Sequence, residues 1–456
     1  MKTFCLFDYR VWLTVMLSAL LGLSWNAFTP IFDIKPLFLL AMPCTAVFFL
    51  MMVTKPRWTI ALIILTRPLL DIVLDSTRIG SGEGGIGLGA VLNLGVIILV
   101  VFLAFYLKRF PWENSVMSCW VIYLACMLAA VLYSPIKMES VRMWSNYLSY
   151  FALFLLPFFI VKDSRDFLFW IKVLGFSFVL PILLADVDMA RGGRYFEDAG
   201  MRIAGTFTHP NILAFYLVLA FTFFFYLLNS GYLKSRPMVG LLIRAMMVDI
   251  LALLVATKTR NAWISIYVGF IIYAVLKDRK MLALLIIVVP LFCCLPPVYQ
   301  RMESVLKNKT VGRYQSANSF EWRRQIWESS IPKILQKPVQ GYGLGTFKYM
   351  SGQFSENKHM GAHNTYLELA FETGLVGLTS FIVLFLSQLA VFFRNMRSSQ
   401  DPAAARIWTL MVGYVITYML ICSADNLLYY LVFNWYVWFF IGLMVVAAQR
   451  RYPVYA

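Results

Sequence analysis

The chain carries about fourteen apolar stretches of roughly 17 to 25 residues, and this repetition constrains its fold more than any other feature. Each stretch is long enough to cross about 30 Å of hydrocarbon as an α-helix, which satisfies its own backbone hydrogen bonds inside a bilayer. We therefore predict an all-α, polytopic membrane helix bundle of about 12–14 transmembrane helices. The expected spans lie near 11–28, 34–53, 57–74, 86–107, 115–133, 145–161, 166–186, 211–229, 239–256, 261–276, 280–297, 365–393, 406–422 and 427–448.

The composition excludes a soluble protein. Of the 456 residues, 61% are hydrophobic and 14% are charged, whereas soluble domains have shares of about half and about a quarter. The net charge of +17 does not indicate nucleic-acid binding, because the lysines and arginines are scattered among short loops. Seven cysteines, mostly within spans and without Cys-x-x-Cys spacing, predict neither a disulfide framework nor a metal centre. We expect no cofactor.

Lysines and arginines concentrate in alternate loops, among them Lys162/Arg165, Lys234/Arg236 and Arg450/Arg451. The positive-inside rule assigns these loops to the cytoplasm. Both termini then lie inside, and the first span is an uncleaved anchor. A long polar loop, 298–364, lies outside, which is the periplasm in a Gram-negative cell.

Ten arginines fall on the outer side under this topology, a surplus that the positive-inside rule does not explain. Guanidinium groups bind phosphate through paired, charge-assisted hydrogen bonds, which suits an anionic, lipid-anchored substrate. Lipid head groups explain Arg78, Arg142 and Arg301 more simply. The ten are Arg78, Arg142, Arg191, Arg194, Arg202, Arg260, Arg301, Arg313, Arg323 and Arg324.

Arg202 lies shortly before a predicted span that starts near Asn211. Asn211 is placed to cap that helix, and the free N–H groups of its first turn would add positive potential beside Arg202. An anion site and a plain turn shaped by Gly205 and Pro210 are equally open readings. Arg260 lies in a short hinge between two spans. It either anchors the chain to lipid head groups or binds a pyrophosphate, and the sequence leaves both roles open.

The long loop contains a predicted amphipathic helix with Phe320, Trp327, Ile331 and Ile334 along one stripe. This helix either lies along the membrane surface or caps the spans. Three alternating glycines follow it and let the backbone approach a bulky neighbour. Without a surrounding strand and helix they do not predict a dinucleotide fold. They are Gly341, Gly343 and Gly345.

His363, one of only three histidines, directly precedes the span near 365–393. An imidazole titrates near neutral pH, and the positive N-terminal end of a helix favours its neutral, proton-accepting form. The structural alternative is a histidine that only hydrogen-bonds at a helix start. His359 does not pair with it as a metal ligand, because Gly361 interrupts a helix there. Glu368 and Glu372 lie one and two turns into the span, where they orient His363 or pair with an arginine.

Four segments resemble the O-antigen ligase and polysaccharide polymerase superfamily of membrane glycosyltransferases. Together they cover roughly residues 200–380, and the last is the most specific. The segments are Arg202-x-x-Gly205-x-Phe207-x-x-Pro210-Asn211, Thr259-Arg260, Arg323-x-x-x-Trp327 followed by Pro338-x-x-Gly341-x-Gly343, and His363-Asn364-x-Tyr366-Leu367-Glu368 with Glu372-x-Gly374-x-x-Gly377.

The resemblance implies a metal-independent transfer of an undecaprenyl-diphosphate-linked glycan on the outer membrane face. His363 would be the base that deprotonates an acceptor sugar hydroxyl. Arg202, Arg260 and Arg323 would bind the diphosphate, with Arg324 as the alternative to Arg323. We expect inversion at the anomeric carbon, because the sequence shows no paired carboxylates at a retaining spacing. The other substrate-binding candidates are Arg191, Arg194, Asn211, Asn364 and Glu368.

On this basis the chain divides into N-terminal transmembrane helices (1–190), a catalytic region with the periplasmic loop (191–397) and C-terminal transmembrane helices (398–456). We expect a multi-pass protein of the bacterial inner membrane with its active site facing the periplasm. Its expected partners are the lipid-linked donor, membrane lipids and polysaccharide assembly proteins.

The acceptor is either another lipid-linked glycan, as in a polymerase, or lipid A core, as in a ligase. The shared motifs do not separate the two. The spans expected before the family region, beyond the dozen usual for ligases, favour a polymerase. A flippase or transporter of the same lipid-linked oligosaccharide is the alternative. Transport predicts charges near the bilayer midplane and two matching halves, whereas these arginines cluster at one face and the sequence shows no internal repeat.

Overall fold

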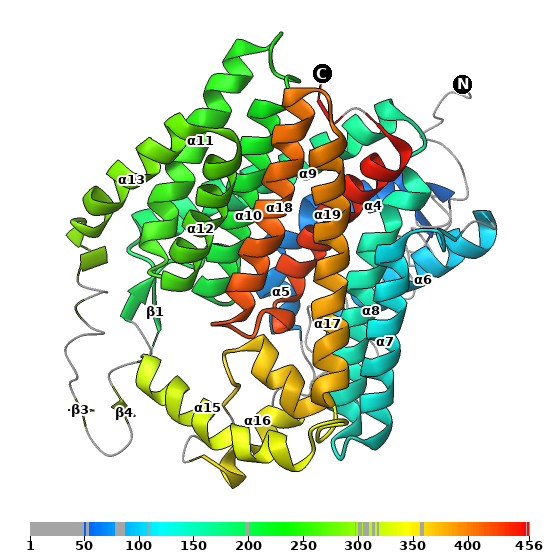
Figure 1. Cartoon of the computed structure of the whole chain (residues 1–456), viewed down its shortest axis with the longest axis vertical. Helices are drawn as coiled ribbons and strands as arrows, with labels where there is room; N and C mark the ends of the chain where they lie inside the picture. Colours follow the sequence, from blue (N-terminus) through cyan, green and yellow to red (C-terminus); the bar gives the residue numbers. More distant parts are fainter. Residues whose placement is uncertain are drawn as a thin grey trace, which may run out of the picture.

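The computed structural model describes residues 50–51, 54–77, 87–107, 110–196, 200–296, 298–299, 303, 310–311, 315–316, 319–355, 360–452 and 454–455. Within these ranges the chain is almost wholly helical, with fifteen α-helices and two short hairpins. The predicted all-α membrane bundle is confirmed (Figure 1).

Eight of the described α-helices lie before residue 257, and seven lie after it. The eight are α4 (Pro56–Thr66), α5 (Asp71–Ser76), α6 (Leu88–Leu107), α7 (Ser115–Tyr133), α8 (Lys137–Ile160), α9 (Ser164–Ala190), α10 (Pro210–Asn229) and α11 (Pro237–Ala256). The seven are α12 (Arg260–Lys277), α13 (Arg279–Cys293), α15 (Ser319–Gln336), α16 (Thr346–Met350), α17 (Thr365–Ser398), α18 (Pro402–Cys422) and α19 (Leu431–Arg450).

Short elements connect the helices. Three 3₁₀ turns are η1 (Arg67–Leu69), η2 (Ser351–Gln353) and η3 (Leu427–Tyr429). The antiparallel hairpins are β1 (Arg194–Phe196) with β2 (Gly200–Arg202), and β3 (Thr310–Val311) with β4 (Gln315–Ser316).

Nine helices of the described part, α6 to α11 and α17 to α19, are long and apolar enough to cross a membrane. The predicted stretch 57–74 is not one helix but breaks at η1. Pro68 explains the break, because it lacks an N–H group and its ring clashes with a carbonyl one turn earlier. Helix α13, in place of the stretch 280–297, has only 15 residues, about 22 Å of helix. The stretches 11–28 and nearly all of 34–53 lie outside the described residues.

Helix α19 forms the centre of the bundle and packs against α8, α9, α10 and α17. In α19, 89% of the most apolar stretch is buried inside the bundle, whereas in α11 the buried share is 33%. A helix that is apolar on all sides needs cover on all sides. Aromatic rings supply it, since the ring centroid of Trp438 lies 4.5 Å from that of Trp120 on α7 and 5.4 Å from that of Phe385 on α17.

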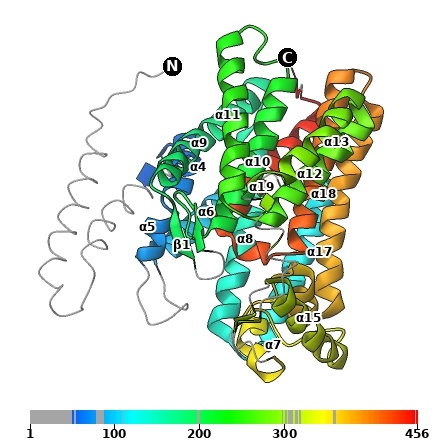
Figure 2. The same ribbon diagram turned by 90° about the vertical axis from the view of Figure 1, so that its left-hand side faces the viewer.

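Helices α15 and α16 lie together at one end of the bundle, and the C-terminal end of α19 lies at the other (Figures 1 and 2). Helix α15 packs against α17 and so caps the spans. Its buried face is rotated from the predicted stripe. Ile326 is fully buried and Trp327 and Ile334 pack beside it, whereas Ile331 is 48% exposed. The side chain of Phe320 lies outside the described part.

Helix α17 is broken at Gly374, where φ is 64° and ψ is −170°. The break leaves the carbonyl groups of Phe371 and Glu372 without donors from the next turn. The N–H groups of Tyr342 and Gly343 replace them at 3.0 and 2.8 Å. The bulky neighbour of Gly341 is therefore the backbone of α17, whereas Gly343 packs against Ser134 and Gly345 against Met143. The two hydrogen bonds to α17 fix the loop that leads to α16.

We expect Gly374→Ala to lower the apparent melting temperature in detergent by several degrees. A Cβ atom at this position would lie 2.1 Å from the carbonyl oxygen of Val339, and the backbone conformation disfavours other residues by about 1–3 kcal/mol. Size-exclusion chromatography after heating measures the change. In the control Gly240→Ala, the new Cβ meets only the flexible side chain of Arg244 at 3.5 Å. Equal stability of the two variants would contradict the role of the break.

Candidate active site

A buried carboxylate, Asp425, lies in the turn between α18 and η3, with a side chain that is 2% exposed. Its Oδ2 accepts a hydrogen bond from Nδ2 of Asn211 at 2.7 Å. Its Oδ1 accepts from the hydroxyl of Tyr430 at 2.7 Å and from the N–H of Asn426 at 2.9 Å. Nδ1 of His363 lies 3.6 Å from the same Oδ1, which is long for a hydrogen bond but close enough for an ion pair.

The turn that holds Asp425 is bonded to the first residues of α17. Asn364 caps this helix as its side chain accepts from two N–H groups of the first turn, each at 3.1 Å. The N–H of Asn364 donates to Oδ1 of Asn426 at 3.0 Å, and the hydroxyl of Thr365 donates to the carbonyl of Asp425 at 2.8 Å. These bonds fix His363 next to the carboxylate. Helix α17 begins where the sequence predicted.

The imidazole of His363 is enclosed on two sides. The ring of Trp322 stands edge-on to it with centroids 5.1 Å apart. The side chain is 27% exposed, yet Nδ1 is buried, so the accessible part of the ring faces away from Asp425. The backbone of His363 has a φ of 47°, a left-handed conformation that costs about 1–3 kcal/mol in a residue other than glycine and is common at functional sites.

Opposing effects act on the pKa of Asp425. Burial disfavours the charged carboxylate and raises its pKa, but the nearby imidazole of His363, the charge of Arg323 and the hydroxyl of Tyr430 outweigh burial. Together they lower the pKa from 3.8 to about 2. Asp425 is therefore an anion at neutral pH and stabilises positive charge on the imidazole beside it.

The structure separates the two neighbouring arginines of α15. Nη1 of Arg323 donates to the carbonyl of Ala424 at 3.0 Å, next to Asp425. Arg324 instead pairs with Glu328 at 3.6 Å, and its side chain is 53% exposed. Arg323 is thus the member of the pair that lies at the carboxylate.

Arg202 is buried and bonded to the hinge before α12. Its Nε donates to the carbonyl of Thr257 at 2.7 Å, and its Nη2 donates to Oδ1 of Asn211 at 2.8 Å and to the hydroxyl of Thr259 at 2.9 Å. Arg260 directly follows Thr259 and is the first residue of α12. A chain of polar contacts thus joins His363, through Asp425 and Asn211, to the Arg202 hinge. Phosphate binding by Arg202 and Arg260 stays a prediction.

The predicted capping role of Asn211 is wrong. Helix α10 begins at Pro210, and Nδ1 of His209 accepts from the N–H of Asn211 at 3.1 Å. Proline suits the first helical position because no N–H is needed there, which moves the cap one residue before it. The side chain of Asn211 is thereby free to bridge Asp425 and Arg202.

Two other predicted substrate ligands have their contacts around the end of α9 and the β1–β2 hairpin. Arg194 donates from Nη2 to the carbonyls of Gly205 and Phe207, each at 2.9 Å, and lies 3.8 Å from Asp188. It ties the β1–β2 hairpin to the following turn. Arg191 ends α9 with an exposed side chain.

His363, Asp425 and Glu368 line a cavity of about 540 Å³. Glu368 accepts a hydrogen bond from the hydroxyl of Tyr429 at 2.8 Å. Arg142, which the sequence assigned to head groups, lies in the cavity wall and pairs with Glu139 at 2.7 Å. The predicted outer residues outside the described part of the chain are Arg78, Arg301, Arg313 and His359.

Glu372 stabilises the fold next to this cavity, since it accepts from the N–H of Phe347 at 3.1 Å at the start of α16. Across the described ranges, no three His, Cys, Asp or Glu side chains gather as a metal site would require. Metal independence stays a prediction.

Sequence reasoning did not single out Asp425. A signal was present, because Asp425 stands in a short loop between two predicted spans, where a carboxylate needs a partner. That partner, His363, is 62 residues earlier, and only the fold brings the two together.

We expect Asp425→Asn to lower the melting temperature in detergent at about pH 7. At about pH 2.5 the melting temperature of this variant should lie closer to that of wild type. The folded-state pKa is depressed, so the carboxylate stabilises the protein above about pH 4 and loses this effect as the pH falls toward 2. Glu328→Gln, at a residue that is 62% exposed, is the control and should differ little from wild type at either pH. A difference between Asp425→Asn and wild type that does not shrink in acid would contradict this role.

The chain is similar to known proteins over the region that holds much of this site. A sequence model described as O-antigen ligase matches residues 245–382, which include Arg260, Arg323 and His363. An O-antigen ligase of Salmonella typhimurium is 22% identical over 312 residues, covering 64% of this chain and 75% of the relative. An O-antigen polymerase of Salmonella muenchen is 23% identical over 325 residues, covering 65% of this chain and 80% of the relative.

Proposed function

Because the chain belongs to the O-antigen ligase and polysaccharide polymerase superfamily, we propose that it transfers an undecaprenyl-diphosphate-linked glycan to an acceptor sugar hydroxyl. The reaction takes place at the periplasmic face of the bacterial inner membrane. The acceptor is another lipid-linked glycan, so that the protein is a surface polysaccharide polymerase in preference to an O-antigen ligase.

The observation that carries this proposal is the contact between His363 and the buried anion Asp425 at the mouth of the helix bundle. In the proposed reaction the acceptor hydroxyl gives its proton to the imidazole of His363. Asp425 stabilises the resulting imidazolium, and its partners Asn211 and Tyr430 keep the carboxylate in place. The deprotonated oxygen attacks the anomeric carbon of the donor.

The leaving lipid diphosphate gains negative charge as its bond to the sugar breaks. Arg323, next to Ala424, and Arg260, at the hinge before α12, supply positive charge for it. Arg202 orders the same hinge through Thr257 and Thr259. These guanidinium groups act in place of a metal ion in the proposal. A single displacement of this kind inverts the anomeric configuration.

The location of the site supports a periplasmic reaction. Helices α15 and α16, which cover His363, lie at the end of the bundle opposite the C-terminal end of α19 (Figure 1). The positive-inside rule assigns Arg450 and Arg451, at that C-terminal end, to the cytoplasm. The preference for a polymerase rests on the spans predicted before residue 190.

We expect His363→Ala to reduce glycan transfer by about 10²–10⁴-fold, the usual contribution of a general base. The assay supplies the purified protein with an undecaprenyl-diphosphate-linked repeat unit, alone and then with lipid A core. A ladder from the donor alone identifies a polymerase, and product only with core identifies a ligase. Near-normal product from the variant would reject the base role. Movement of donor across vesicles without a new glycosidic bond would favour the transporter alternative.

The two arginines of α15 offer a matched pair of variants. Arg323→Ala should reduce transfer on the order of 10²-fold, because it removes charge that stabilises the departing diphosphate. Arg324→Ala should stay near the wild-type rate, since its side chain points to Glu328 and solvent. The same transfer assay measures both, and equal loss in the two variants would contradict the assignment.

A further inference from the structure

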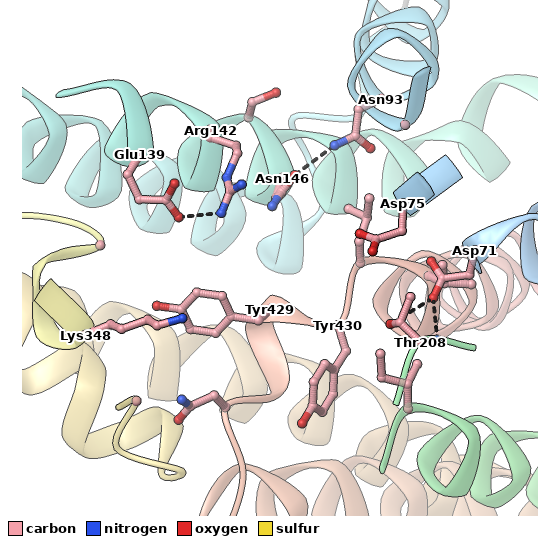
Figure 3. Close-up of a pocket in the computed structure, with 18 of the residues that line it drawn as sticks. Asp71, Asp75, Asn93, Glu139, Arg142, Asn146, Thr208, Lys348, Tyr429 and Tyr430 are labelled. Atoms are coloured by element: carbon pink, nitrogen blue, oxygen red, sulfur yellow. Dashed lines mark hydrogen bonds and ion pairs between the residues drawn. The ribbon is translucent and has the colours of Figure 1, made fainter. Parts of the chain in front are cut away.

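The cavity beside His363 extends well beyond the residues of the proposed reaction. Its far wall comes from η1, α5, α6 and α8, all between residues 67 and 146. Figure 3 shows Glu139, Arg142 and Asn146 projecting from α8 toward Tyr429 and Tyr430 on the opposite side. This wall lies outside the family-matched segment 245–382.

The charges of the cavity differ from those around the diphosphate arginines. None of Arg202, Arg260 and Arg323 lines it, whereas His363 and Asp425 do. Among the described residues, five carboxyl groups line it against three cations, so this part of its wall has no excess of positive charge with which to bind a diphosphate. The carboxyl groups are those of Asp71, Asp75, Glu139, Glu368 and Asp425, and the cations are Arg67, Arg142 and Lys348.

The polar groups of the wall are ordered in pairs. Arg67 lies 3.4 Å from Asp71, Arg142 lies 2.7 Å from Glu139, and Nδ2 of Asn93 donates to Asn146 at 2.8 Å. The hydroxyl and N–H of Thr208 each donate to Asp71 at 3.4 Å (Figure 3). Side chains that are fixed in this way can recognise a ligand at little entropic cost.

Two of these side chains retain hydrogen-bonding capacity. Arg67 and Asn93 are each 3% exposed. Within the described part of the chain, Nε of Arg67 and Oδ1 of Asn93 have no hydrogen-bond partner. Buried polar atoms are rarely left in this condition, which is the second sign that this wall is built for a polar ligand.

We propose that this cavity binds the acceptor glycan through the hydroxyl groups of its sugar residues. Hydroxyl groups both donate and accept, so they match a wall that mixes carboxylates with amide and guanidinium donors. The rings of Tyr429 and Tyr430 offer apolar faces to the carbon faces of a sugar.

The occupant is the acceptor and not the donor for a geometric reason, which rests on the proposed function. In an inverting displacement the nucleophile arrives opposite the leaving group. The arginines mark the leaving-group side of His363, and the cavity is the side that they do not line. Residues 67–146 therefore determine which acceptor is extended, while His363, Asp425 and the arginines provide the chemistry.

Binding of two separate probes to the purified full-length protein tests this assignment. One probe is the repeat-unit oligosaccharide released from its lipid carrier, which has no diphosphate. The other is undecaprenyl diphosphate without a glycan. We expect Asn146→Ala and Arg142→Gln to weaken oligosaccharide binding at least about tenfold, as a loss of fixed hydrogen bonds does, and to leave undecaprenyl diphosphate binding unchanged.

The matched control is Asn395→Ala, near the other end of α17, where the amide bonds only to the carbonyl of Val391. It should leave both affinities unchanged. All variants are compared as monodisperse protein with wild-type melting temperatures, and two cavity variants are used so that one misfolded variant does not decide the result.

Unchanged oligosaccharide affinity in both cavity variants would overturn the assignment, and so would an equal loss for both probes. The transfer assay with His363→Ala tests the proposed function separately. If that variant were fully active, the proposed reaction would be rejected. The binding measurements would still decide whether the cavity holds a glycan.

Discussion

A negative charge buried among helices is stable only where its oxygen atoms are paired, and Asp425 meets this condition with groups from three parts of the chain. Asn211 comes from α10, Tyr430 directly precedes α19, and His363 lies two residues before α17. The carboxylate thus fixes the N-terminal ends of these helices relative to one another. The carboxylate that orders the turn also lies beside the imidazole. Asp425 therefore has a structural role and, in the proposed reaction, a chemical one.

The break in α17 extends this order to the helices that cover the site. At Gly374 the helix is broken, and N–H groups of the loop before α16 bond to the carbonyl groups of Phe371 and Glu372. Glu372 then receives the N–H of Phe347 at the start of α16. Together with the apolar cluster under α15, these contacts hold Arg323 beside Ala424. A glycine without any chemical role is therefore needed for the position of a charge at the site.

Charge is divided unevenly around His363. Arginines lie toward α12 and α15, and a mixed wall of carboxylates, amides and paired cations lies toward α5, α6 and α8. A diphosphate and a neutral sugar need opposite environments, since the first needs net positive charge and the second needs donors and acceptors in balance. In the proposed reaction, two substrates of different chemistry thereby meet at one imidazole.

The sequence by itself determined the membrane class, most spans and the start of α17 at Thr365, because hydrophobic length and capping residues act locally. It also singled out His363 and the arginines by residue type. Tertiary structure decided the rest. Asp425 and its partner are 62 residues apart, Arg323 and Arg324 differ only in which side of α15 they occupy, and Arg142 faces a cavity whose walls come from distant segments. Such placements depend on how helices pack, and no local pattern in the chain carries that information.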